Sequence, residues 1–306
     1  MQKISYQKTV KSYATLNNGL MFSLFTFVII LLFSSAAPTT AVFNVLTFAE
    51  LYDIRMQSRE MLSGTSTLVK YSYMLVFKVI APIILSYGLL KGKTTLVFAS
   101  LVFFLLGFAI SAHKSILLTP IAMILLFYCI KRSLNIKLAI CNSVLALSLI
   151  SCFSSGTVQL VVGDVLTRRV FLVPGMLTDM YFTYFSTSDF NLFSSIREKF
   201  SDERTTSLAF RIGGEVFGRS EMSANAGFVA SGYAEAGVLG VIIYAALILF
   251  VFMCLDSKDK LAKNLYLLAA FPILLAILET NLTTIFLTHG LVFLILVKFL
   301  WRIKHF

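Results

Sequence analysis

Long apolar runs separated by short polar links dominate the chain. A membrane-spanning helix needs about 20 mostly apolar residues, and eight runs approach that length. They cover residues 20–37, 71–90, 94–112, 115–130, 138–154, 236–255, 264–280 and 283–300. The apolar positions are continuous rather than alternating, and an open sheet edge cannot face lipid. The pattern therefore predicts an all-α, polytopic integral membrane protein with about eight transmembrane helices.

The composition agrees with this assignment. Hydrophobic residues make up 58% of the 306-residue chain and charged residues only 13%, whereas soluble domains carry about 25% charged residues. The charges are too few to cover a water-facing surface, which excludes a soluble enzyme, a disordered tail and a secreted disulfide scaffold. The four cysteines lie in or beside apolar runs without a C-x-x-C pair, which favours helix packing over metal or disulfide use. We expect a single membrane domain over residues 1–306.

The lysines indicate how this domain is oriented. Twelve of the sixteen fall in the N-terminal segment, in three alternate links and at the C-terminus. Under the positive-inside rule this places both termini in the cytoplasm, so the net charge of +11 reflects topology and does not indicate a nucleic-acid partner. The outer side then holds a first loop, residues 38–69, and a large loop, residues 155–235. A cleaved signal peptide is the alternative for residues 20–37, although Pro38 argues against cleavage.

Arginine is distributed the opposite way from lysine. Eight of the ten arginines lie on the outer side. They are Arg55, Arg59, Arg168, Arg169, Arg197, Arg204, Arg211 and Arg219. The planar guanidinium fork fits a phosphate or carboxylate in a two-point contact. Two interpretations stay open, namely recognition of an anionic ligand and ion pairing with acids of the same loop. The adjacent pair Arg168-Arg169 suits a ligand because neighbouring guanidiniums repel unless they share an anion.

A few polar residues lie within or beside the apolar runs. Lys78, Glu279 and His289 are ionisable residues in or near predicted spans, where such residues are functional candidates; a structural His–Glu hydrogen bond explains two of them equally well. Lys114 lies in a tight outer turn. The three histidines share no metal-ligand spacing.

Residues 211–240 hold seven of the sixteen glycines, and we expect Gly237 and Gly240 to pack helices closely.

Four stretches of the chain follow one another in a recognisable order. They are Arg168-Arg169-Val-Phe-Leu-Val-Pro174-Gly175, Tyr181-Phe182-x-Tyr184-Phe185, Ile212-Gly213-Gly214-Glu215-Val-Phe217-Gly218, and Ala224-Asn225-Ala-Gly227-Phe228 continuing to Gly240. With the residues from Gly107 to Pro120, this order resembles the oligosaccharide repeat-unit polymerases, that is, the Wzy-type O-antigen polymerases of bacterial surface polysaccharide pathways. Members of that family usually have more spans before this region, which predicts an N-terminally shortened member.

The resemblance implies a multi-pass glycosyltransferase of the bacterial inner membrane that needs no metal or cofactor. It would polymerise undecaprenyl-diphosphate-linked repeat units at the periplasmic face, with a lipid-linked glycan donor, a lipid-linked acceptor and membrane lipid as partners and a chain-length regulator as a further candidate. The expected catalytic residues are Arg168, Arg169 and Arg211 on the diphosphate and Glu215 as general base, with Glu221 and Asp179 as alternative bases. Lys114, Asn225 and Tyr233 are the expected substrate-binding residues.

Two other functions fit the same pattern. An O-antigen ligase is the first, although ligases of the related family carry a histidine in the large outer loop and residues 155–235 contain none. A lipid-linked oligosaccharide flippase or transporter is the second. Transporters typically show internal repeats and broken helices at mid-membrane; no repeat is evident, but the intramembrane ionisable residues Lys78, Glu279 and His289 keep this alternative open.

Overall fold

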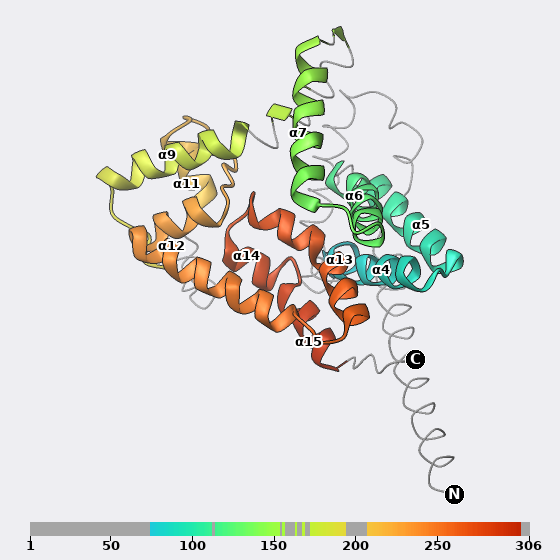
Figure 1. The fold of residues 1–306 in the computed structure, drawn as a ribbon. Helices are drawn as coiled ribbons and strands as arrows, with labels where there is room; N and C mark the ends of the chain where they lie inside the picture. The colour runs from blue at the N-terminus through green and yellow to red at the C-terminus, as the bar shows by residue number, and fades with distance from the viewer. Residues whose placement is uncertain are drawn as a thin grey trace, which may run out of the picture. The chain divides into compact units, whose positions relative to one another are not determined.

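The computed structural model describes residues 74–111, 114–153, 155–156, 163, 167–168, 172–193 and 207–300. Every regular element within these ranges is a helix, as Figure 1 shows. This confirms the all-α prediction for the described part of the chain. The first apolar run, residues 20–37, and the first outer loop, residues 38–69, lie outside the described residues. The chain folds into two compact units, which are described one at a time below.

The first unit contains a tight helical hairpin. The helix α4 (Ala81–Lys91) ends at Gly92, which adopts a left-handed conformation with φ 66°, and α5 (Thr94–Ser111) begins two residues later. Such a glycine is a common helix terminator because it carries no Cβ. The Oγ of Ser100 on α5 donates a hydrogen bond of 2.9 Å to the carbonyl of Ala81 on α4. The hairpin matches two of the predicted apolar runs.

A π-helix, η2 (Val76–Ile80), leads directly into α4. Its residues Val76, Phe77 and Ile80 form a buried cluster against which Phe293 packs. Phe293 belongs to α15 (Leu291–Leu300), whose neighbour in the chain is the short α14 (Leu282–Leu287). The prediction of one helix over residues 283–300 is therefore wrong, because residues 288–290 interrupt it.

The second unit contains the helices that follow the predicted large loop. In it α9 (Val173–Thr187) packs against α12 (Phe228–Leu255), with the short α11 (Leu208–Glu215) beside them (Figure 1). The helix α7 (Ile136–Phe153) also belongs to this unit. Two further helices, α6 (Lys114–Lys131) and α13 (Lys260–Ile277), each contribute residues to both units.

The helix α12 is broken after its second turn. Ala236 has φ −155° and ψ 34°, and Gly237 has φ 61° and ψ −145°, so neither is helical. A φ of +61° strains any residue that carries a Cβ. Gly240 packs as closely as predicted, since a Cβ there would lie 1.9 Å from the carbonyl oxygen of Gly232. Gly237 differs from the prediction, because it breaks the helix rather than packing it.

Among the residues that the structure describes, two helices, α12 and α13, are long and apolar enough to cross a membrane. Shorter apolar helical stretches cover Thr94–Phe108, Ser115–Lys131 and Cys141–Ile150. Beyond its break, α12 exposes large apolar side chains on several sides. They include Val238, Leu239, Ile242, Leu249, Phe250 and Met253. A helix that is apolar all round and uncovered by protein is suited to lipid, so the described part of the chain has helices of membrane-spanning character.

Candidate functional site

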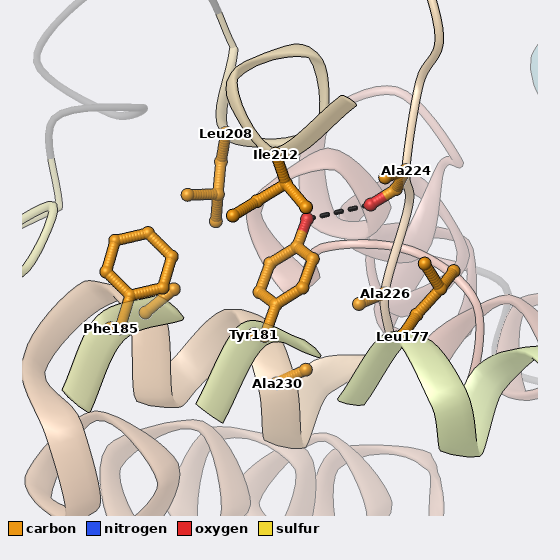
Figure 2. Close-up of a cluster of buried hydrophobic side chains, with 9 residues drawn as sticks. Leu177, Tyr181, Phe185, Leu208, Ile212, Ala224, Ala226 and Ala230 are labelled. Atoms are coloured by element: carbon orange, nitrogen blue, oxygen red, sulfur yellow. Dashed lines mark hydrogen bonds between the residues drawn. The ribbon is translucent and has the colours of Figure 1, made fainter. Parts of the chain in front are cut away.

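The predicted large outer loop contains its own apolar core, which we call the loop cluster. Its buried members are Leu177, Tyr181, Phe185, Leu208, Ile212, Ala224, Ala226, Ala230 and Ala234. They come from α9, α11, the first half of α12 and the chain between the last two. Figure 2 shows the Tyr181 ring at the centre of this core, with its hydroxyl donating a 2.8 Å hydrogen bond to the carbonyl of Ala224. The cluster thus fixes α9 relative to α11.

Three polar side chains meet at the edge of the loop cluster. The hydroxyl of Tyr184 donates a hydrogen bond to Oε2 of Glu215. The Nε of Arg211 donates to the other carboxylate oxygen of Glu215 at 3.2 Å, and its Nη2 donates to the Tyr184 hydroxyl at 3.1 Å. The guanidinium also lies 5.5 Å from the centre of the Tyr184 ring and 5.9 Å from that of Phe185, within cation–π range. We call Tyr184, Arg211 and Glu215 the polar triad.

The positions of the three residues along α9 and α11 explain this arrangement. Arg211 and Glu215 are separated by one turn of α11, so their side chains share a face of that helix. Tyr184 precedes the buried Phe185 on α9 and follows the buried Tyr181 by three residues. Because Tyr181 is anchored in the loop cluster, Tyr184 points along the edge of that cluster toward α11. Two predicted catalytic residues, Arg211 and Glu215, are therefore brought together.

The triad holds its charges at neutral pH. The hydrogen bond from Tyr184 lowers the pKa of Glu215, and the charge and hydrogen bond of Arg211 lower it as well, against an opposing effect of burial. Burial lowers the pKa of Arg211, but the interactions with Tyr184 and Glu215 outweigh it and raise that pKa overall. The result is a carboxylate beside a guanidinium, which corresponds to the ion-pairing interpretation of the outer arginines.

The ion pair leaves both groups accessible. The Arg211 side chain is 33% exposed and that of Glu215 is 51% exposed. A guanidinium carries five N–H donors, and the contacts with Glu215 and Tyr184 use two of them. The triad therefore presents a positive group and a carboxylate to the same side. Such a pair can oppose developing negative charge and accept a proton within one small region.

An aromatic group lies on the opposite side of α9. The ring of Tyr233 on α12 contacts the ring of Phe182 edge-on, with centroids 4.3 Å apart, and that of Phe190 at 5.9 Å. Tyr233 is partly exposed. Asn225 is exposed in the non-helical segment before α12, where its Oδ1 accepts a 3.2 Å hydrogen bond from Ser223. Two of the three predicted substrate-binding residues, Asn225 and Tyr233, thus border the loop cluster.

The remaining predicted site residues lie outside the triad. Arg168 is exposed in a short described segment. Arg169 lies outside the described residues. Lys114 begins α6, and its side chain is also outside the description. The alternative bases, Glu221 and Asp179, are both exposed. Among the residues the structure describes, no group of three or more histidine, cysteine or acidic side chains is arranged to hold a metal ion.

Sequence reasoning missed a buried carboxylate at the break in α12. Glu235 is fully buried and accepts a 3.1 Å hydrogen bond from the side-chain amide of Asn191. The backbone N–H groups of Asn191 and Leu192 donate to the carbonyls of Ala234 and Glu235, each at 2.8 Å. The loop after α9 is thus fastened to the last helical residues before the break. The sequence did contain a signal for this residue, because Glu235 is an acidic residue placed directly before an apolar run of about twenty residues.

Tyr184 was also missed as a site residue. It stands in the aromatic stretch Tyr181-Phe182-x-Tyr184-Phe185, but the sequence alone could not separate the buried members from the one that reaches a carboxylate.

In comparisons with known proteins, no protein-family model matches the chain, and neither a curated protein nor a solved structure matches it. Function therefore has to be argued from the residues themselves.

Proposed function

We propose that this chain is a multi-pass glycosyltransferase of a bacterial inner membrane that polymerises undecaprenyl-diphosphate-linked oligosaccharide repeat units. In this proposal all eight apolar runs cross the membrane, both termini are cytoplasmic, and the loop of residues 155–235 faces the periplasm. The distribution of lysine and arginine supports that orientation. The ordered motifs described above support the resemblance to Wzy-type polymerases.

The polar triad is the observation that carries the proposal. The acceptor sugar's hydroxyl attacks the anomeric carbon of the donor glycan, so a new C–O bond forms there as the bond to the diphosphate oxygen breaks. Glu215 takes the proton from the attacking hydroxyl. Arg211 opposes the charge that develops on the departing undecaprenyl diphosphate, and Tyr184 holds the Glu215 carboxylate in place.

The other predicted residues have supporting roles in the proposal. Arg168 and Arg169 add charge for the diphosphate, because a two-point guanidinium contact suits phosphate oxygens. Tyr233 offers a partly exposed ring to the apolar face of a sugar, and Asn225 offers both a donor and an acceptor to its hydroxyls. Lys114 is a further candidate for the lipid-linked substrate. A chain-length regulator is a candidate partner.

Deletion and complementation test the proposal directly. Removing the gene from its host should collapse the ladder of surface glycan to a single-repeat band on a gel, and plasmid-borne wild type should restore it. Plasmids carrying Arg211→Ala or Glu215→Gln should fail to restore the ladder at equal protein levels. Arg219→Ala is the matched control, since Arg219 is an exposed arginine of the same loop, and it should restore the ladder. A full ladder with Glu215→Gln would exclude that residue as the base.

A flippase or transporter is the second candidate, and one feature favours it. The final apolar run is broken at residues 288–290, and the buried His289 in this break interacts electrostatically with Lys78. Broken spans with ionisable residues are typical of transport pathways. The same deletion separates the two functions. Accumulation of lipid-linked repeats on the cytoplasmic side would favour the transporter, whereas single repeats on the cell surface favour the polymerase.

A further inference from the structure

The break in the final apolar run lies directly against the π-helix η2. Gly290 adopts φ +78°, and a Cβ added there would come within 2.6 Å of Val79 Cγ2 and 2.8 Å of Leu75 Cδ2. Only glycine allows the chain to turn so close to η2. Phe293, one turn into α15, continues the contact with Val76 and its neighbours. The break is therefore a packed feature of the first unit.

This packing buries a histidine whose ring is incompletely hydrogen-bonded. His289 is only 9% exposed, and its Nδ1 finds no hydrogen-bond partner among the residues that the structure describes. A buried nitrogen without a partner has lost its hydration without compensation, which destabilises the fold. Buried polar atoms of this kind are uncommon in native structures, and a ligand is one of the explanations for them.

The facing π-helix supplies a second nitrogen donor. Lys78 lies within η2, is partly buried and acts electrostatically on His289. Single turns of π-helix occur frequently at functional sites. The residues beside Lys78, including Phe77 and Val79, are buried and apolar. In apolar surroundings the positive charge of a lysine is costly to bury, and an anion beside it offsets that charge while it accepts hydrogen bonds from neighbouring N–H groups.

We propose that η2 and the break at residues 288–290 form a binding site for a phosphate group. The ammonium of Lys78 and the Nδ1–H of His289 each donate a hydrogen bond to a phosphate oxygen. Phosphate suits the site because several oxygens on one centre can serve two donors at once while their charge offsets that of Lys78. The phosphate comes from a lipid headgroup or from free phosphate. This site uses residues of the first unit and does not depend on the polar triad or on the proposed polymerase activity.

Nitrogen NMR of His289 tests the site. The chain has three histidines, so the double variant His113→Gln/His305→Gln leaves His289 as the single ring signal. That protein, labelled with ¹⁵N-histidine, is placed in dodecyl maltoside micelles in phosphate-free buffer at constant pH. One arm adds inorganic phosphate, and the other adds phosphatidic acid to the micelles. We expect a saturable shift of the His289 ring resonance in at least one arm.

The two arms identify the source of the phosphate. A shift with inorganic phosphate assigns the site to free phosphate, and a shift with phosphatidic acid alone assigns it to a lipid headgroup. Lys78→Met should weaken the binding at least tenfold, and Lys78→Arg should largely retain it. If the His289 ring resonance of the parent protein is unchanged in both arms, the proposal is overturned, and no Lys78 variant is needed to reach that conclusion. An equal response in Lys78→Met and the parent, with matching size-exclusion profiles, overturns the role of Lys78.

Discussion

Gly240 lies against the carbonyl oxygen of Gly232, across the break in α12. The backbone atoms approach so closely that a Cβ on Gly240 would lie 1.9 Å from that oxygen. The two halves of α12 are therefore in contact on one side of the break, while Gly237 carries the unusual dihedral angles. Because the obstructing atom is backbone, a side chain at position 240 cannot be relieved by a change of rotamer.

Gly240→Ala should destabilise the protein by about 1–3 kcal/mol, the usual range for overpacking. Thermal or denaturant unfolding of the purified protein in detergent measures this. Gly175→Ala is the matched control, since nothing lies within 4 Å of a Cβ at that helical position and alanine favours a helix. Equal stability of the two variants would show that the approach at Gly240 relaxes at little cost.

Tyr181→Phe should cost about 1–3 kcal/mol of unfolding free energy, because the carbonyl of Ala224 loses a buried hydrogen-bond donor. Burial, and secondarily the charge of Glu235, raise the pKa of Tyr181, so its hydroxyl stays protonated and donating. Tyr128→Phe, at a position that is 54% exposed, should change stability by less than about 0.5 kcal/mol. Equal losses in both variants would contradict the role assigned to the Tyr181 hydroxyl.

Tyr184→Phe should raise the pKa of Glu215 toward its ordinary value, because the hydrogen bond from Tyr184 is the main cause of the lowered pKa. A carboxylate whose pKa is lower in the folded state than in the unfolded state stabilises the fold at pH values above its unfolded pKa. That stabilisation is lost as the pH falls through the folded-state pKa. The variant should therefore lose less stability on acidification. Carboxyl ¹³C NMR measures the pKa, with Glu215→Gln for assignment and Tyr233→Phe as a control that leaves it unchanged.

Asn191 and Glu235 should show an energetic coupling of about 0.5–3 kcal/mol in a double-mutant cycle. Asn191→Ala removes the amide that donates to the buried carboxylate, and Asn191→Asp adds a negative charge beside it, so the aspartate should be the more destabilising change. Unfolding free energies of Asn191→Ala, Glu235→Ala and the double variant supply the cycle. Additive losses would mean that the observed hydrogen bond contributes nothing.

The helices of this fold were largely predictable because each needs only a continuous apolar stretch of sufficient length. Most helices that match a predicted run begin and end within a few residues of it. The helix α12 begins before its run, at Phe228, and α9 and α11 lie inside the predicted large loop, where no run was predicted. Gly237 breaks α12, and Gly290 and its two predecessors break the last run. A glycine inside an apolar run is compatible with either helix packing or a break, and the outcome depends on what lies opposite it in three dimensions.

The candidate site was predictable only in part. Arg211 and Glu215 are one helical turn apart, so a short-range rule was enough to bring them together. Tyr184 joins them from 27 residues away from Arg211 in sequence, through the anchoring of Tyr181 in the loop cluster. Asn191 reaches Glu235 across a separation of 44 residues. Such partners depend on tertiary packing, and the periodicity of one segment carries no information about them.

The buried side chains of the loop cluster all come from one short stretch of the chain, so they are synthesised together. Its buried members all fall between Leu177 and Ala234, so every side chain of that core has been made before the ribosome reaches the apolar half of α12. Contacts within so short a stretch require little loop closure. The core can therefore assemble before the later helices have been synthesised, and Leu278, whose carbonyl lies against Gly227, packs onto a core that has already formed.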